Sequence, residues 1–241
     1  PTNYIPLSDP YRTAPYNASF THVANTIPEV AAGGVFANQA STNDNIVDWV
    51  FLELRNTKVS PGNTVLQTRS ALVQRDGDIV DIDGVSPVTF NNVASTNYVI
   101  AVRHRNHLGL STDPSTYTPA LGETKSTASL VDLTTVTGTQ LFGSSSGAYT
   151  IASDGKNLLW AGNANFNSNV KFNGLGNDKD YILVNTLSNN SGSTLNGVYL
   201  PADVNMNGNV KYNGLGNDKD YIFVTVLASN AANIRTQQLP N

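Results

Sequence analysis

The sequence contains no cysteine, so disulfide bonds and cysteine nucleophiles are excluded from its chemistry. The lack of cysteine does not exclude an oxidising compartment, because a protein located there need not form disulfide bonds. Charged residues are also scarce, because they make up 13% of the 241 residues, about half of ordinary usage. The formal net charge is -4, and no run of basic residues occurs. These features argue against nucleic acid or an anionic membrane surface as a partner.

Long apolar runs and common catalytic motifs are missing as well. No stretch approaches the roughly twenty apolar residues of a membrane-spanning helix, so the sequence predicts no membrane span. It has no H-E-x-x-H and no phosphate-binding loop. The hydrophobic content of 39% is nevertheless enough for a folded core. We therefore expect a folded protein that is not an enzyme.

Two groups of polar residues invite a catalytic or metal-binding interpretation, and both have a structural alternative. His104 and His107 lie three residues apart, and an odd spacing along a strand sends side chains to opposite faces, so a shared metal is not expected. An acidic cluster surrounds a predicted hairpin. We expect it to form cross-strand ion pairs with Arg103 or Arg105, and paired catalytic carboxylates are the remote alternative. The cluster comprises Asp76, Asp78, Asp81 and Asp83.

What the sequence does contain is one stretch carried twice. The first copy runs over residues 163–184 and the second over residues 203–224, at an offset of 40 residues. The segment N-G-L-G-N-D-K-D-Y-I is identical in both copies. A repeat of this length is one supersecondary unit copied in tandem, and two copies are too few for a solenoid. We therefore expect a small domain of two paired units.

The second copy opens with the beginning of a calcium-binding loop. Oxygen-bearing side chains stand at every second position before Gly208, so that a curled loop can point them inward at a hard cation. The acid that closes an ordinary loop of this kind is missing at the twelfth position, Gly214, and the next acids follow later in the chain. We therefore expect calcium in a longer loop. The predicted ligands are Asp203, Asn205, Asn207 and either Asp218 or Asp220.

The first copy has a weaker version of the same pattern, because amides replace the early acid and Ser168 replaces the glycine. Amide oxygens can coordinate calcium, but each lost carboxylate lowers the attraction for the cation. For both copies the alternative is a metal-free loop, closed by hydrogen bonds from side chains to the backbone. The ligands predicted for the first copy are Asn163, Asn165, Asn167, Asp178 and Asp180.

Each copy continues into a predicted helix at its Asn-Asp-Lys-Asp run. Asn217 is a suitable N-cap, and acidic residues in the first turn suit the helix dipole. Apolar residues recur at spacings of four from Asp218 to Leu227. We expect the two short helices to pack together, since an isolated one is marginal in water. The side chains predicted to be buried between them are Ile182, Leu183, Ile222 and Phe223.

A β-rich region precedes the repeats. Ile46 to Arg55 has apolar side chains on both faces and predicts a central strand. A second strand, Thr64 to Arg75, leads into a two-residue turn at Asp76-Gly77. Short strands separated by turn signals predict a mainly β fold, an antiparallel β-sandwich. The remaining predicted strands are Asp78–Ile82, Val88–Phe90, Tyr98–Arg105 and Ser129–Leu133.

These two regions together resemble a known group of proteins. The repeats resemble dockerin-type calcium repeats. They are more closely similar to the C-terminal region of large secreted and cell-surface proteins of Bacteroidetes-type bacteria. There, D-x-N-x-D-G-x-V-K-Y followed by N-D-R-D recurs twice after a β-rich segment. Residues 48–50, 74–78 and 102–107 are similar to that group too, so the resemblance covers most of the chain from about residue 45. It implies an extracellular or bacterial cell-surface location, and a β-sandwich followed by two dockerin-like loop–helix repeats.

The sequence thus predicts three parts. Residues 1–44 form an extended, proline-rich N-terminal arm, residues 45–147 the β-sandwich domain, and residues 148–241 the two-repeat, calcium-loop-like domain. Prolines hinder a regular sheet in the arm, so it either lies across its own domain or packs on a neighbouring molecule.

The function that we expect is that of a non-catalytic extracellular structural protein. It would be a self-assembling subunit of a filament or surface layer, or an adhesive module, and the partner would be further copies of the chain in a homo-oligomer or polymer. Two alternatives remain open. One is a dockerin-like module that docks on a specific protein. The other is a carbohydrate-binding sandwich that holds a glycan ligand on exposed aromatics such as Tyr98 or Tyr117.

Overall fold

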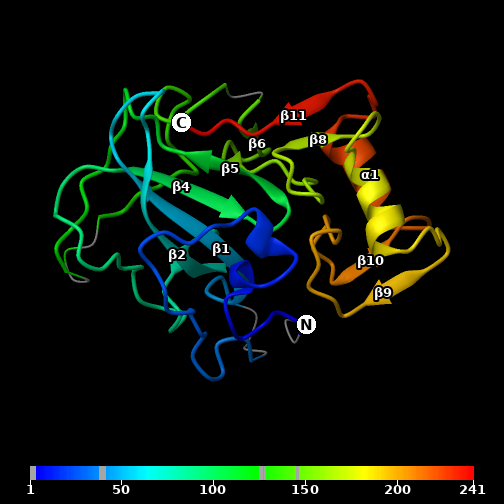
Figure 1. Cartoon of the computed structure of the whole chain (residues 1–241), viewed down its shortest axis with the longest axis horizontal. Helices are drawn as coiled ribbons and strands as arrows, with labels where there is room; N and C mark the ends of the chain where they lie inside the picture. The colour runs from blue at the N-terminus through cyan, green and yellow to red at the C-terminus, as the bar shows by residue number, and fades with distance from the viewer. Residues whose placement is uncertain (1–3, 38–41, 125–126, 128, 145–146) are drawn as a thin grey trace. The chain divides into compact units, whose positions relative to one another are not determined.

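The computed structural model describes residues 4–37, 42–124, 127, 129–144 and 147–241, and these residues form a mainly β protein (Figure 1). They divide into two compact units. The first unit comprises the described residues of Pro1–Arg103, Leu110–Gly143 and Leu239–Asn241. The second unit comprises the described residues of His104–Gly109 and Ser144–Gln238. Residues 1–3 and 38–41 of the predicted arm lie outside the described residues.

The first unit is built on a five-stranded antiparallel sheet with the strand order β3-β2-β1-β4-β5 (Figure 1). The central strand is β1, and all but one of its residues are buried, as its apolar residues on both faces predict. Strand β2 pairs with it along nearly its whole length, and β4 pairs with its second half, from Phe51 to Arg55. The strands are β1 (Ile46–Arg55), β2 (Val65–Gln74), β3 (Ile79–Val80), β4 (Val99–His104) and β5 (His107–Ser111).

Three details of the predicted sheet are wrong. The turn between β2 and β3 has three residues, 75–77, because Gln74 pairs with Asp78 and Gly77 takes a φ of 98°. Residues 88–90 and 129–133 are irregular rather than strands. Their apolar side chains, including Phe90 and Leu133, instead pack on the face of the sheet that carries Leu52. The apolar content of these segments signalled contact with the sheet and not pairing within it.

The described part of the N-terminal segment, residues 4–37, lies on the opposite face of the same sheet. The rings of Tyr11 and Phe20 are buried against Phe51, with both centroids 5.4 Å from its ring centroid. The Tyr11 hydroxyl donates to the backbone carbonyl of Trp49 at 2.9 Å. Of the two alternatives for this segment, the structure has the one in which it folds back on its own domain.

The second unit contains the two repeats, and each completes the sheet of the other. Strand β8 (Asn169–Lys171) of the first repeat pairs with β11 (Ile234–Thr236), which follows the second repeat. Strand β10 (Asn209–Lys211) of the second repeat pairs with β9 (Thr194–Asn196), which follows the first. Since two-stranded sheets are marginal alone, this exchange makes the repeats mutually dependent. A further small hairpin precedes them, β6 (Thr150–Ile151) with β7 (Asn157–Leu158).

The predicted helices are present and begin where the sequence places them. Helix α1 (Asp178–Asp180) has Asn177 as its N-cap, and α2 (Asp218–Asp220) has Asn217. Both continue into six-residue π-helical turns, which the sequence did not indicate. These turns are η4 (Tyr181–Thr186) and η5 (Tyr221–Val226).

The core of the second unit joins the two repeats. Ile182 and Ile222 are fully buried in one cluster, as predicted. Leu183 and Phe223 are only half-buried, so their predicted full burial is wrong. The Phe223 ring lies at the margin of the cluster, 4.8 Å from the ring centroid of Phe172.

Truncating either buried isoleucine should therefore destabilise both repeats together. We expect Ile182→Ala and Ile222→Ala each to lower the free energy of unfolding of the second unit by about 2–4 kcal/mol, because each leaves a cavity in the shared core. The exposed Val184 and Val224 provide matched controls, and their alanine variants should change it by about 0.5 kcal/mol or less. Urea unfolding followed by hydrogen exchange measures this. Exchange that rises in one repeat only would contradict the shared core.

Candidate functional site

The two repeat loops are each closed on a buried carboxylate. In the first repeat, Asp178 accepts the Ala164 N–H on Oδ1 and the Lys171 N–H on Oδ2, both at 2.9 Å. These bonds tie the start of the loop and the strand β8 to the start of helix α1. The second repeat has the same contacts on Asp218, from the N–H groups of Val204 at 3.0 Å and Lys211 at 2.9 Å.

Burial changes the acidity of both carboxyl groups. Asp178 and Asp218 have no exposed surface. Loss of hydration raises the pKa of each to about 7, although the backbone N–H bonds act in the opposite direction. The negative charge of Asp203 also raises the pKa of Asp218, which places these two carboxylates close together. The second loop therefore concentrates more negative charge than the first.

The amide residues of the predicted calcium sites close their own loops. In the second repeat, the Asn205 and Asn207 side-chain oxygens accept the N–H groups two residues ahead, at 3.2 and 2.9 Å. Asn205 also donates to the Gly216 carbonyl at 2.9 Å. In the first repeat, Asn165 and Asn167 make corresponding turns. Such bonds are those of the metal-free alternative.

The last acid of each predicted ligand set, Asp180 or Asp220, bonds to the N-cap residue of its helix. Asp220 accepts the Asn217 amide at 2.7 Å, while the Asn217 oxygen accepts the Asp220 N–H at 2.8 Å. This reciprocal arrangement differs from a capping box in one respect, because the acid accepts from the side-chain amide of the N-cap residue and not from its backbone N–H. Asp180 and Asn177 make the same two bonds in the first repeat. The Asp180 and Asp220 side chains are about half exposed and pair with a lysine, so they cap helices at the margin of the loops.

The first ligand position separates the two repeats most clearly. Asp203 is buried, and its oxygens accept the Asn207 N–H at 3.0 Å and the Gly208 N–H at 3.1 Å. Its Oδ2 also lies 3.6 Å from Nη2 of Arg105. The equivalent Asn163 is uncharged and 6% exposed, and its side-chain oxygen has no hydrogen-bond partner among the described residues.

These contacts allow the calcium prediction to be tested for fit. A calcium ion needs six to eight oxygen atoms directed at it. In the second loop, the oxygens of Asp203, Asn207 and Asp218 are directed at backbone N–H groups, and a guanidinium adjoins Asp203. The folded loop thus fits the metal-free alternative better than a resident cation. Calcium binding by either repeat stays a prediction.

The two histidines lie together, so the expectation that they occupy opposite faces is wrong. Strand β4 ends at His104, and the turn Arg105-Asn106 reverses the chain before β5 begins at His107. Their Nδ1 atoms are 2.9 Å apart, and the rings are nearly perpendicular. Asn106 Oδ1 lies 2.8 Å from His107 Nδ1, which favours His107 as the donor and His104 as the acceptor. The odd-spacing rule failed because the chain turns between them.

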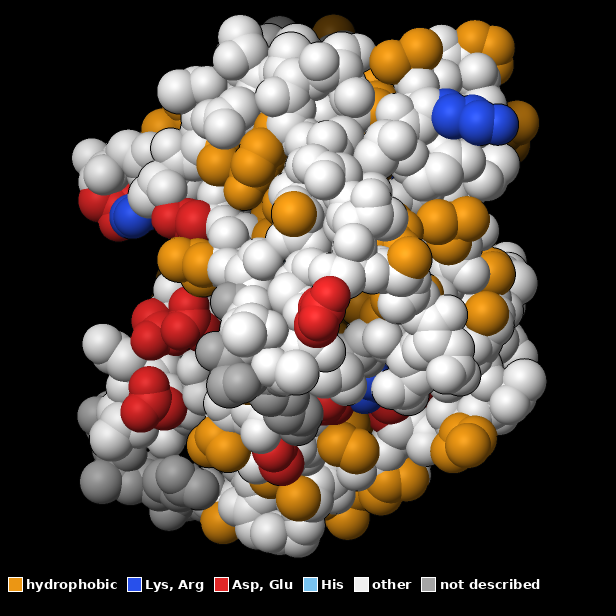
Figure 2. Space-filling view, turned by 90° about the vertical axis from the view of Figure 1, so that its left-hand side faces the viewer, with side chains coloured by type: hydrophobic (Ala, Val, Ile, Leu, Met, Phe, Trp, Pro, Cys, Tyr) orange, Lys and Arg blue, Asp and Glu red, His pale blue; other side chains and the backbone are white. Residues whose placement is uncertain are grey.

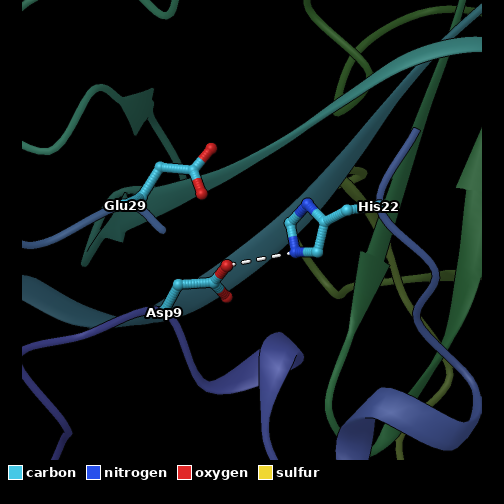
Figure 3. A group of neighbouring side chains, drawn as sticks. All are labelled: Asp9, His22 and Glu29. Carbon is cyan, nitrogen blue, oxygen red and sulfur yellow. Dashed lines mark ion pairs between the residues drawn. The ribbon is translucent and has the colours of Figure 1, made fainter. Parts of the chain in front are cut away.

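A third cluster, in the first unit, was not predicted. Asp9, His22 and Glu29 place ligand atoms within 4.8 Å of one another, a spacing compatible with a metal ion (Figure 3). The dashed line in Figure 3 marks the 3.1 Å approach of His22 Nε2 to Asp9 Oδ2. All three come from the irregular N-terminal segment, where no periodicity points to a shared site.

Arginines neutralise the carboxylates of this cluster. Arg12 lies 3.1 Å from Asp9 and 3.3 Å from Glu29, and Arg69 on β2 binds Glu29 at 3.0 Å. Burial alone raises the pKa of Asp9, but contacts from His22, Ser70 and the Tyr11 N–H outweigh it and hold the pKa below its ordinary value. A metal ion would have to displace an arginine, so the arrangement is an ion network that fastens the segment to the sheet.

Asp81, one acid of the predicted cluster, forms an ion pair as expected but with a different arginine. Asp81 pairs with Arg69 at 2.7 Å rather than with Arg103 or Arg105. Arg103 pairs with Glu53 on β1 at 3.0 Å. The guanidinium of Arg105 instead adjoins Asp203, within the second unit. These pairings are structural, and none of them places two carboxylates across an open site.

Among the described residues, no helix is both long enough and apolar enough to cross a membrane. Comparison of the chain with protein-family models, with curated proteins and with solved structures gives no match.

Proposed function

We propose that the chain is a non-catalytic extracellular structural protein that assembles with copies of itself through its repeat unit. A duplicated feature carries the proposal: Leu175 and Leu215, at equivalent positions of the two repeats, are 96% and 97% exposed. Each stands between two glycines of positive φ, so the loop projects the side chain. Single exposed leucines need no explanation, but two in identical projecting loops are typical of contact residues.

A second copy of the chain is the partner that the surface favours. The repeat unit also exposes Val184, Val224 and Ile234, each about half accessible, against which a projecting leucine can pack. Charged residues make up only 13% of the chain, and on the face drawn in Figure 2, the left-hand side of Figure 1, uncharged groups surround a few clusters of acidic side chains. Little charge repulsion therefore opposes association of like copies. A contact between unlike surfaces of one molecule builds a filament or layer unless it closes into a ring.

We also propose a finer architecture for the two units. The five-stranded sheet supports a layered β first domain, but among the described residues irregular segments cover its two faces, where a sandwich would have a second sheet. The duplicated, capped loop–helix units support a pair of dockerin-like repeats in the second. The resemblance to bacterial secreted and cell-surface proteins supports an extracellular or cell-surface location.

One alternative function gains support and one loses it. A module that docks on a different protein would use the same two leucine loops, so their exposure favours it as the second candidate. The carbohydrate-binding alternative loses one of its aromatics, because Tyr98 is 6% exposed and its hydroxyl donates to the Ala94 carbonyl at 2.8 Å. Tyr117 is half-buried.

The proposal predicts that the leucine loops control association. Light scattering and sedimentation of the full chain should show concentration-dependent growth in mass, and the double variant Leu175→Ser, Leu215→Ser should remain monomeric. Leu130, an 84% exposed leucine of the first unit, is the matched control, and Leu130→Ser should assemble like the intact chain. A monomeric intact chain at high concentration would refute self-assembly. Unchanged assembly of the double variant would place the contact elsewhere.

A further inference from the structure

The second repeat loop buries two carboxylates, whereas the first buries one. Asp203 and Asp218 both have no exposed surface, and they lie close enough for one charge to act on the other. Two buried carboxylates are strongly unfavourable unless a cation accompanies them. In the first loop Asn163 replaces the first of them, so only Asp178 remains to be neutralised.

Arg105 is positioned to neutralise the negative charge of these carboxylates. Its side chain is 1% exposed, and its guanidinium lies 3.6 Å from Asp203 Oδ2. The other contacts of the guanidinium hold it in place, since Nη1 donates to the Leu200 carbonyl at 2.5 Å and Cζ lies 4.4 Å from the Tyr199 ring centroid. A buried arginine with these contacts cannot turn towards water without losing all of them.

The neighbouring Asn106 anchors the same turn to both repeats. Its side-chain amide donates to the Asp203 carbonyl at 2.6 Å. Its backbone carbonyl accepts the N–H groups of Gly162 and Asn163, at 2.9 and 3.0 Å. The turn between β4 and β5 therefore contacts the first position of each loop, and its arginine adjoins the carboxylate at the first position of the second.

We propose that the guanidinium of Arg105 is the permanent cation of the second loop, supplying the charge that calcium would supply and leaving no place for it. The two loops then differ by one matched pair: the second has an added carboxylate, Asp203, and an added arginine. Calcium affinity of the second loop is accordingly set by Arg105, not by the Asp203, Asn205 and Asn207 pattern alone.

A gain of calcium dependence on removing Arg105 is the test. Thermal unfolding of the full chain is measured with a chelator and with millimolar calcium. The midpoint of Arg105→Met should fall by roughly 10 °C or more in chelator, because Asp203 is left unpaired. Calcium should restore about half of that loss or more. Arg105→Lys keeps the charge and should remain insensitive to calcium.

Two further variants keep the test decisive if Arg105→Met does not fold alone. The double variant Arg105→Met, Asp203→Asn copies the neutral first position of the first repeat, so it should fold in chelator and ignore calcium. Asn163→Asp adds a carboxylate without an arginine, so it should acquire a calcium response in the first loop. Arg235→Met, which removes an arginine stacked on Trp160, should lose stability equally with and without calcium.

Three results would count against the proposal. The first is calcium stabilisation of the intact chain that Asp203→Asn abolishes, since the second loop would then bind calcium with Arg105 present. The second is a double variant that is no more stable than Arg105→Met in chelator, because the arginine would then have a role unrelated to the charge of Asp203. Absence of any calcium response in Asn163→Asp also counts against it.

Discussion

Replacing Glu29 with alanine is expected to lower the free energy of unfolding of the first unit by about 3 kcal/mol, since removing one partner of a buried ion pair costs about 3–5 kcal/mol. Glu29 is 5% exposed and accepts the Ser70 N–H at 3.2 Å besides its contacts with Arg69 and Arg12. The lower end applies because each arginine keeps a second carboxylate, Asp81 or Asp9.

The same substitution should release the N-terminal segment from the sheet before the sheet itself unfolds. Limited proteolysis should then cut between residues 12 and 30 in Glu29→Ala, and hydrogen exchange should rise there first. Glu123→Ala is the control, because Glu123 is exposed, and it should change stability by about 0.5 kcal/mol or less. A loss below about 1 kcal/mol for Glu29→Ala would mean that aromatic packing, not the ion network, holds the segment.

Local signals in the sequence predicted the parts of the fold that depend on local chemistry. Strand β1 has the bounds that its apolar residues on both faces predict. Asn177 and Asn217 cap their helices as predicted, since a side-chain oxygen needs only the N–H three residues ahead to do so. In both cases the partners lie close together in the chain or recur with a fixed period.

Contacts between distant segments were not predictable in this way. Asp9, His22 and Glu29 stand in irregular chain, so nothing in their spacing indicates that they meet. The prediction for the two histidines failed for a smaller reason, because the predicted strand was one residue too long. A turn at that place brings together two side chains that a continuous strand would separate. The sequence of one repeat alone has no feature that predicts the exchange of strands between the two repeats.

The sequence pattern does not identify the cation that neutralises the acidic side chains. Acidic and amide side chains at alternate positions indicate that a positive charge lies nearby, but either a metal ion or a guanidinium can supply it. At both Asp203 and Glu29 the structure provides an arginine, and it comes from a distant part of the chain. Residue types along a loop therefore predict the charge of the partner better than its chemistry.

The second unit should become less stable as the pH rises from about 4 to about 7 in a chelating buffer. Burial raises the pKa of Asp178 and Asp218 from 3.8 to about 7, so the folded unit binds more protons than the unfolded chain in this range. Stability is then fully present below the unfolded pKa and is lost as the pH passes the folded one. Since one pKa unit equals about 1.36 kcal/mol, each carboxyl contributes about 4 kcal/mol.

The first unit should respond in the opposite direction. The pKa of Asp9 is held below its ordinary value, so its contribution is present above the unfolded pKa and is lost as the pH falls through the folded one. Acid should therefore loosen the N-terminal segment under conditions in which the repeats are most stable. Hydrogen exchange over β1–β2 and over β8–β11 at several pH values separates the two effects.

Carboxyl NMR titration measures the cause directly, and each repeat contains its own control. The signals of Asp178 and Asp218 should change with midpoints near 7, whereas Asp180 and Asp220, two residues further along, should titrate below the ordinary value because their lysine and asparagine partners lower the pKa. If all four carboxyls titrate near 4, the buried pair is hydrated in solution, and the predicted loss of stability towards neutral pH would not occur.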